Sequence, residues 1–371
     1  MRRAEPGAAQ ASRVRLDMSR LAALLLVIVL TPVALAAVAT PAFAHGRASD
    51  TTNYASRITS APDLPGVRWE VYNGDEFLGV ENTGPAELII PGYIPGEQFL
   101  RISPGGVFVN HNAQAYYLNQ DRYSRVRPPE GVGPDATPDW VKVSSTPRYA
   151  WHDHRIHWMS FGLPPQVRDK GKLTRIFSWQ IPFTYGGRQH QLGGELLWVP
   201  GPSPWPWLLA ALPVVAIPAL LGLRSKPESG RWPGLVRPAA ATLGVLAAAN
   251  LIHLVDDLTA TPIPWTSTVF AAAQTALFIG IALFGAVRAW QAGDGAFAAL
   301  GIGSGALLIG QGLLYFPVLS ASHSATVFPL ALTRAVVAAS IVQAFPLGVI
   351  VVRGNDRQLA EPAIPEQVSA Q

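Results

Sequence analysis

The second half of the chain consists of long apolar runs separated by short polar gaps. Each run approaches the roughly 20 residues with which an α-helix crosses a bilayer core of about 30 Å. The pattern predicts an all-α bundle of five transmembrane helices over 207–352, with spans at about 207–223, 239–258, 267–289, 296–316 and 328–352. The first run is the shortest and contains two prolines, Pro213 and Pro218.

The segment 45–199 has a different pattern, made of short runs in which apolar and polar residues alternate. Turn-forming clusters such as Asn73-Gly74-Asp75 and Tyr185-Gly186-Gly187 separate these runs. Many short strands at close spacing, without a helical period between them, are typical of an immunoglobulin-like antiparallel sandwich. We expect an all-β sandwich with core tryptophans at 69, 179 and 198 and strands at 67–72, 86–91, 98–102, 140–143, 173–183 and 190–199. The proline-rich stretch 200–206 predicts a stiff linker into the first span.

The first 44 residues have the features of an export signal. Basic residues precede an apolar run from Leu21 to Ala39, and the small-residue site Ala42-Phe43-Ala44 follows. This arrangement predicts a secretory signal peptide over 1–44, more compact if translation starts at Met18. Cleavage would make His45 the mature N-terminus. An uncleaved signal anchor is the alternative, and both place residue 45 onward outside the membrane.

Composition agrees with a membrane protein. Only 14% of the 371 residues are charged, whereas a soluble globular protein usually has about 25%. This deficit argues against an ordinary cytosolic enzyme. The net charge is +4, but the basic residues are not placed as a nucleic-acid site would need, so we expect no nucleic acid as partner. The apolar spans make a lipid bilayer the expected partner. The absence of Cys excludes a disulfide scaffold, a thiol catalyst and a Cys-ligated metal.

The loop charges predict the orientation. Lys and Arg lie between the first and second spans, between the third and fourth, and after the fifth, whereas the loops at about 259–266 and 317–327 contain neither. Cytoplasmic loops carry the excess of Lys and Arg. We therefore expect a plasma-membrane protein with an extracytoplasmic β domain and a cytoplasmic, disordered tail at 353–371.

Four ionisable residues interrupt the predicted spans: His253, Asp256 and Asp257 in the second and Arg334 in the fifth. Helical spacing places His253 on one face with the two carboxylates. Intramembrane ionisable groups are costly and usually mark a function or a pairing. Two interpretations stay open: an ion pair from an Asp to Arg334 that fixes packing, and an ion or metal pathway that begins at His253 with His323 at its mouth.

The stretch from Trp151 to Trp158 carries three histidines, His152, His154 and His157. In an extended chain the first two point to one side and His157 to the other. Imidazole suits Zn, Cu, Fe and Ni, and with no Cys and three Met, nitrogen and oxygen ligands favour Cu(II). Asp153 would be a carboxylate ligand or a partner that fixes an imidazole tautomer.

A free His45 would strengthen this prediction. Its α-amine, with an ordinary pKa of about 7.7–8.0, deprotonates readily, so amine and imidazole could chelate one ion. One histidine from 152–157 would complete a three-nitrogen site. The structural alternative is a polar strand or turn between packing tryptophans, with an ion pair between Asp153 and Arg155. His111 and His190 are expected to be a turn residue and a core residue.

Four stretches carry a resemblance to a known group: Thr52-Asn53-Tyr54, Pro95-Gly96 before Phe99 to Ile102, Tyr117-Leu118-Asn119, and Trp151 to Met159. Together they resemble uncharacterised actinobacterial exported multi-span membrane proteins, which imply no activity.

A second resemblance rests on His45 after Phe43-Ala44 with a later His-rich stretch. These features are similar to copper-resistance proteins of the CopC kind, which are exported β-sandwiches with an N-terminal histidine copper site, sometimes fused to CopD-like membrane domains. That resemblance implies a CopC-like sandwich and copper as the bound ion.

Three functions follow as hypotheses. The first is a membrane-anchored, extracytoplasmic metal-binding protein, with Cu(II) as the expected ion, in copper homeostasis or uptake. The second is a non-catalytic interaction or sensory module without a metal. The third is an oxidative copper enzyme with an N-terminal histidine chelate, which a five-span anchor disfavours. The sequence contains no Ser/His/Asp signature, P-loop, dinucleotide fingerprint or HExxH helix, and we therefore expect a protein without catalytic activity.

Overall fold

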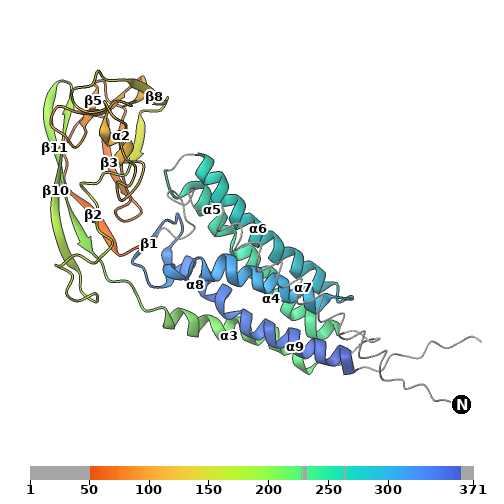
Figure 1. The fold of residues 1–371 in the computed structure, drawn as a ribbon. Helices are drawn as coiled ribbons and strands as arrows, with labels where there is room; N and C mark the ends of the chain where they lie inside the picture. Colours follow the sequence, from red (N-terminus) through yellow and green to blue (C-terminus); the bar gives the residue numbers. More distant parts are fainter. Residues whose placement is uncertain (1–50, 227, 229–231, 263–264, 361–371) are drawn as a thin grey trace, which may run out of the picture. The chain divides into compact units, whose positions relative to one another are not determined.

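A computed structural model describes residues 51–226, 228, 232–262 and 265–360 (Figure 1). Its N-terminal part is rich in β-sheet, and five long apolar helices follow. The predicted signal peptide over 1–44, residue His45 and residues 361–371 of the predicted tail lie outside the described residues. The expectation of disorder was wrong for 353–360, which continue the last helix.

The β region is built from eleven strands and one short helix, α2 (Gln114–Leu118). The strands are β1 (Thr51–Thr52), β2 (Tyr54–Ser60), β3 (Val67–Tyr72), β4 (Phe77–Asn82), β5 (Leu88–Pro91), β6 (Gln98–Ser103), β7 (Gly106–Asn110), β8 (Trp140–Ser144), β9 (Arg148–Trp151), β10 (Thr174–Tyr185) and β11 (Arg188–Trp198). Seven of them form an antiparallel sheet in the order β2-β11-β10-β5-β6-β7-β8, and β3-β4-β9 form a second sheet.

The long hairpin β10–β11 shows how the sequence specifies the larger sheet. Its turn residues Gly186 and Gly187 both have positive φ, as a two-residue hairpin turn requires. Along β10 the buried side chains Trp179, Ile181 and Phe183 alternate with exposed ones. This alternation is the period of a strand with one face on the core.

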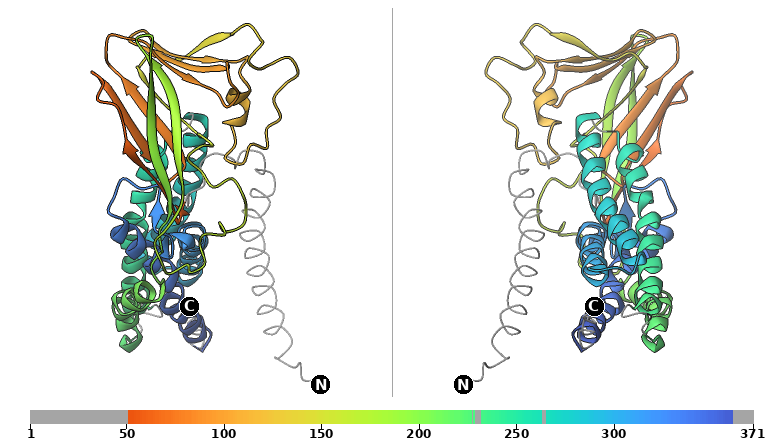
Figure 2. Two further views of the ribbon diagram at one scale, coloured as in Figure 1. Left: turned by 90° about the vertical axis from the view of Figure 1, so that its left-hand side faces the viewer. Right: turned by 90° about the vertical axis from the view of Figure 1, so that its right-hand side faces the viewer.

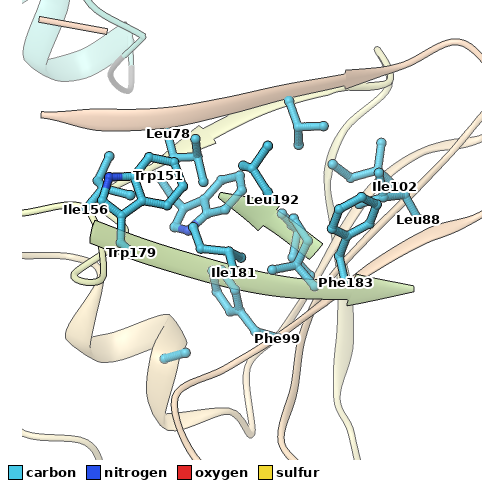
Figure 3. Close-up of a cluster of buried hydrophobic side chains, with 14 of the residues drawn as sticks. Leu78, Leu88, Phe99, Ile102, Trp151, Ile156, Trp179, Ile181, Phe183 and Leu192 are labelled. Carbon is cyan, nitrogen blue, oxygen red and sulfur yellow. The ribbon is translucent and has the colours of Figure 1, made fainter. Parts of the chain in front are cut away.

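One apolar core serves both sheets (Figure 3). Leu78 from β4 and Trp151 from β9 belong to the same buried cluster as Leu88, Ile181 and Leu192 from the seven-stranded sheet. Trp179 and Trp198 are buried in it as expected, whereas Trp69 is only partly buried against it. All six predicted strands are present. Five further strands of this region, β1, β2, β4, β7 and β9, were not predicted; β4 and β7 are buried on both faces, so they lack the alternation that identifies a strand.

The helical region contains the five predicted spans, at Trp205–Arg224, Pro233–Thr259, Trp265–Trp290, Ala296–Leu313 and Leu330–Asp356. Their helices are α3 (Trp205–Leu221), α4 (Pro233–Ala249), α5 (Leu251–Thr259), α6 (Trp265–Trp290), α7 (Ala296–Leu307), α8 (Leu330–Val342) and α9 (Ala344–Ala360), seen in two further views in Figure 2. Large apolar side chains such as Val214, Val245 and Phe284 are exposed on them. Helices of this length and composition are those of a membrane protein with the lipid bilayer as partner.

Three of the five spans are interrupted. The second breaks between α4 and α5 at Asn250, and the fifth breaks between α8 and α9 at Gln343. The fourth ends in a π-helical turn, Leu308–Leu313, which contains Gln311. Each interruption therefore carries an amide side chain, and all three amides are buried.

A short pairing joins the β region to the helical region. Strand β12 (His323–Ser324), in the loop between the fourth and fifth spans, pairs antiparallel with β1. The backbone N–H of Ser322 donates to the Asn53 side chain, and Asn73 donates to Thr261. The β region therefore contacts the loop between the second and third spans and the loop between the fourth and fifth.

Gly194 provides a test of the core. It lies opposite Trp179 in the β10–β11 register, and a Cβ added there would lie 2.1 Å from the indole and 2.4 Å from the carbonyl oxygen of Arg57. We expect Gly194→Ala to destabilise the chain by about 1–3 kcal/mol, because the indole must leave its position. The measurement is the urea midpoint of the full chain in detergent, read by tryptophan fluorescence. Gly193→Ala is the matched control, since its Cβ would meet only Ser60 at 3.5 Å; equal effects would contradict the packing.

Candidate functional site

The histidine stretch is a turn, not an extended strand. β9 ends at Trp151, and the backbone N–H of Ile156 then donates to the carbonyl of Asp153 at 3.0 Å. Ile156 is fully buried in the β-region core and anchors this turn. The expectation that His157 points away from the other two histidines was therefore wrong. Its ring centroid lies 6.1 Å from that of His152 and 6.3 Å from that of His154.

His157 is the centre of the group and is only 1% exposed. Within the described part of the chain, neither of its ring nitrogens has a hydrogen-bond partner. Nδ1 lies 3.6 Å from Oδ2 of Asp75. A buried polar group without a partner is rare in folded proteins and indicates an unplaced water, an ion or a functional role.

Asp75 comes from the turn between β3 and β4, where Asn73 and Gly74 both have positive φ. The carboxylate is completely buried, and Arg122 binds it at 2.6 Å while also binding Glu76 at 2.6 Å. Burial alone would raise the pKa of Asp75, but Arg122 and His157 favour the charged form, and the pKa is lowered overall. The carboxylate thus stays ionised beside His157.

The other two histidines have defined places. Nδ1 of His152 lies 2.9 Å from the carbonyl oxygen of Glu76, and its ring packs on Phe77. Both nitrogens of His154 are occupied, one by Ser124 Oγ at 2.6 Å and the other by the carbonyl of Asp121 at 3.0 Å. These bonds commit the His154 ring, so its predicted role as a metal ligand does not fit the structure.

Asp153 also differs from the prediction. Its carboxylate accepts hydrogen bonds from Arg155 Nε at 2.8 Å, Arg155 Nη2 at 2.6 Å and the Trp151 indole at 2.9 Å. Burial would raise its pKa, but the Arg155 guanidinium lowers it overall. Asp153 therefore neither binds an imidazole nor has free lone pairs for a metal. The alternative expectation, an ion pair with Arg155, is confirmed.

No complete metal site is formed by the described residues, since no three of their His, Asp or Glu side chains are arranged around one point. His45 lies outside them. His111 is in a turn, as expected, and stacks on Tyr116, whereas His190, expected in the core, is only partly buried and stacks on Phe183.

Asp75, Glu76 and Arg122 were missed by sequence reasoning. Asp75 was visible only as a member of the turn cluster Asn73-Gly74-Asp75. Arg122 is 47 residues from Asp75 and has no local feature that sets it apart. The pairing is tertiary, and no spacing rule reveals it.

The intramembrane residues do not form the expected ion pair. Arg334 donates to the carbonyl oxygens of Val318 at 3.2 Å and Ala321 at 2.6 Å. Asp256 accepts the backbone N–H of Val327 at 2.9 Å. Within the described residues, neither Asp256 nor Asp257 is paired with Arg334. The guanidinium donates its hydrogen bonds to backbone carbonyl oxygens of the 317–321 segment instead.

Asp257 and His253 lie near a tyrosine. Asp257 accepts a 2.5 Å hydrogen bond from Thr275 and a 3.5 Å hydrogen bond from Tyr315. The His253 ring stacks on the Tyr315 ring at 4.0 Å. His323, predicted at the mouth of a pathway, lies in β12, where it pairs with Thr52.

Replacing Arg122 tests the buried charge pair. We expect Arg122→Met to destabilise the full chain by about 3–5 kcal/mol, because it leaves the Asp75 carboxylate buried and uncompensated. The control is Arg125→Met, which removes a largely exposed guanidinium paired with Asp121 and should leave the urea midpoint nearly unchanged, because exposed ion pairs contribute little. Urea midpoints of the two variants give the comparison, and Arg122→Met/Asp75→Asn should recover part of the loss.

The lowered pKa of His154 predicts that the stability of the folded chain depends on pH. Burial, helped by repulsion from His157, lowers its pKa from 6.5 to about 4. Between these values the unfolded chain binds a proton that the folded chain does not, so stability falls as pH drops from about 6.5 to about 4 and levels off below. In His154→Gln the urea midpoint should fall less steeply across this window. An unchanged slope would contradict the assignment.

No family model matches the chain, and neither the curated proteins nor the solved structures contain a match. The resemblance to copper-resistance proteins stays a prediction, since no comparison tests it.

Proposed function

We propose that the chain is a membrane-anchored, extracytoplasmic protein that binds a transition metal ion, with Cu(II) as the preferred ion. Its site combines the imidazole of His157 with the α-amine and imidazole of His45. The observation that carries this proposal is His157 itself, a buried imidazole whose Nδ1 faces Asp75 and whose Nε2 has no hydrogen-bond partner among the described residues. A bound ion is one of the few explanations for a buried nitrogen of this kind.

Asp75 gives His157 the orientation that a metal ligand needs. Metal-binding histidines usually donate their other ring N–H to a carboxylate, which fixes the tautomer and makes the ligating nitrogen more basic. Nδ1 of His157 faces Asp75 at 3.6 Å, which leaves Nε2 for an ion. Because Arg122 compensates the carboxylate, Asp75 is suited to this supporting role rather than to direct ligation.

The start of the described chain lies near this site. A Cβ on Gly74, the neighbour of Asp75, would lie 2.6 Å from the Thr52 methyl group. Only five residues lie between His45 and Thr51, so the proposed second ligand is close to Thr51 along the chain.

The remaining parts of the proposal concern architecture and orientation. We infer that the seven- and three-stranded sheets, which share one core, pack as a β-sandwich of the CopC-like kind. The absence of Lys and Arg from the loops that carry β12 and Thr261 supports an extracytoplasmic β region and a cytoplasmic C-terminus.

Cu(II) titration of the full chain in detergent tests the proposal, after mass spectrometry has established the mature N-terminus. We expect one ion per chain and nitrogen hyperfine structure in the electron paramagnetic resonance spectrum. His157→Gln and an alanine added before His45 should each abolish the stoichiometric signal, whereas Asp75→Asn should weaken binding about 10–100-fold. His190→Gln is the control and should bind as the native chain does.

One observation favours a second function, the interaction or sensory module without a metal. The buried carboxylates near the histidines are already compensated by Arg122 and Arg155, so the network is electrically complete without an ion. Under this function no variant changes the Cu(II) stoichiometry, and the native chain binds no more copper than the version with the added alanine.

A further inference from the structure

The helical region contains a second polar group that the proposed function does not use. In membrane-spanning segments ionisable side chains are costly, face the interior of the bundle and mark proton or ion pathways. Asp257 on α5 has hydroxyl partners, Thr275 and Tyr315, and within the described residues it has no ion pair. Arg334 on α8 is bound to backbone carbonyls.

His253 is an independent observation at the same place. It is 1% exposed, and in the described part of the chain neither ring nitrogen has a hydrogen-bond partner. It lies four residues before Asp257, so both side chains share one face of α5. Tyr315 joins them, since its hydroxyl donates to Asp257 while its ring lies against the imidazole.

Buried amides extend this polar lining toward the middle of the bundle. Asn250 donates to Ser340 at 2.9 Å, and Gln343 accepts from Ser304 at 2.8 Å. Gln311 is fully buried on the π-helical turn, and no partner for its amide occurs among the described residues. π-helical turns within helices occur frequently at functional sites.

The other end of the bundle is apolar. The cluster there is formed by residues that include Leu235, Leu243, Leu300, Leu347 and Ile350, all fully buried. The buried polar side chains therefore begin at the end of the bundle that carries β12 and stop before the apolar cluster. This arrangement fits a site that exchanges a small species with one side of the membrane, rather than a continuous pore.

We propose that Asp257, Tyr315 and His253 form a proton-exchange site within the membrane, reached from the end of the bundle that carries β12. The carboxylate of Asp257 takes a proton from hydronium at that end, leaving water, and Thr275 and Tyr315 hold the charged form by hydrogen bonds. One O–H bond of hydronium breaks as one O–H bond forms on the carboxyl, and no oxidation state changes. When the proton passes to His253, the carboxyl O–H bond breaks and an N–H bond forms on the imidazole.

A proton fits this group better than an alkali-metal ion. Both hydroxyls direct their hydrogens at the carboxylate, so their positive ends oppose a cation there, and imidazole nitrogen is a poor ligand for hard cations, which prefer oxygen. The groups that face Asp257 are Thr275 from α6 and Tyr315 after the π-helical turn, with Asp256 adjacent on α5 and bound to Val327. The site is independent of His157 and needs no metal.

Infrared difference spectroscopy of the full chain in lipid vesicles, without metal, tests the proposal. Acidifying the buffer should produce the carbonyl band of a protonated carboxyl, and D₂O should shift it as soon as it is added. The band should be lost in Asp257→Asn and retained in Asp294→Asn, which changes an exposed carboxyl at the apolar end. His253→Gln and Thr275→Val should move the pH at which the band appears.

Several results would overturn the proposal. A band that persists in Asp257→Asn, or that neither titrates nor exchanges in D₂O, would make Asp257 a structural group. A midpoint that depends on Na⁺ at constant ionic strength would replace the proton with a metal cation. Circular dichroism shows whether Asp257→Asn is folded; if it is not, the midpoint shift in Thr275→Val decides, and no shift there would refute the site.

Discussion

The charge pair between Asp75 and Arg122 is the interaction on which the arrangement of the β-region site depends. A carboxylate taken completely out of water is strongly destabilising unless an opposite charge accompanies it, and Arg122 supplies this charge to Asp75 and Glu76 together. Arg155 does the same for Asp153. With every buried carboxylate beside the histidines committed in this way, His157 is left as the group whose chemistry is unused.

A related constraint shapes the helices. In a bilayer every backbone N–H and C=O needs a partner inside the protein, so a break in a span must be repaired locally. Asn250 donates both to Leu246 of its own helix and to Ser340, and Gln343 donates to the carbonyls of Ser304 and Ser340. The amides at two of the helix breaks therefore tie neighbouring spans to each other.

The sequence predicts features that depend on residues close together in the chain, and it does not predict features that depend on contacts between distant residues. The five spans are found because apolar runs of about 20 residues have few alternative explanations. Strands such as Val67–Tyr72 are found from their alternation, whereas β4, buried on both faces, is missed. In the site, the three histidines are visible because they adjoin in sequence. Their grouping depends on the turn at Asp153–Ile156, and their partner Asp75 depends on tertiary packing; neither leaves a local pattern.

The π-helical turn at Leu308–Leu313 has a consequence for how the chain tolerates length changes. A π-turn holds one residue more than the α-helical turn it replaces, and one α-helical residue corresponds to a rotation of about 100°. Because the π-turn already absorbs that extra residue, removing one residue there would convert it to an α-helical turn and leave Tyr315 facing His253 and Asp257, whereas removing one residue from α7 would turn the ring by about 100° around the helix axis. The π-helical turn is thus the place in the fourth span where the loss of one residue disturbs the aromatic ring least.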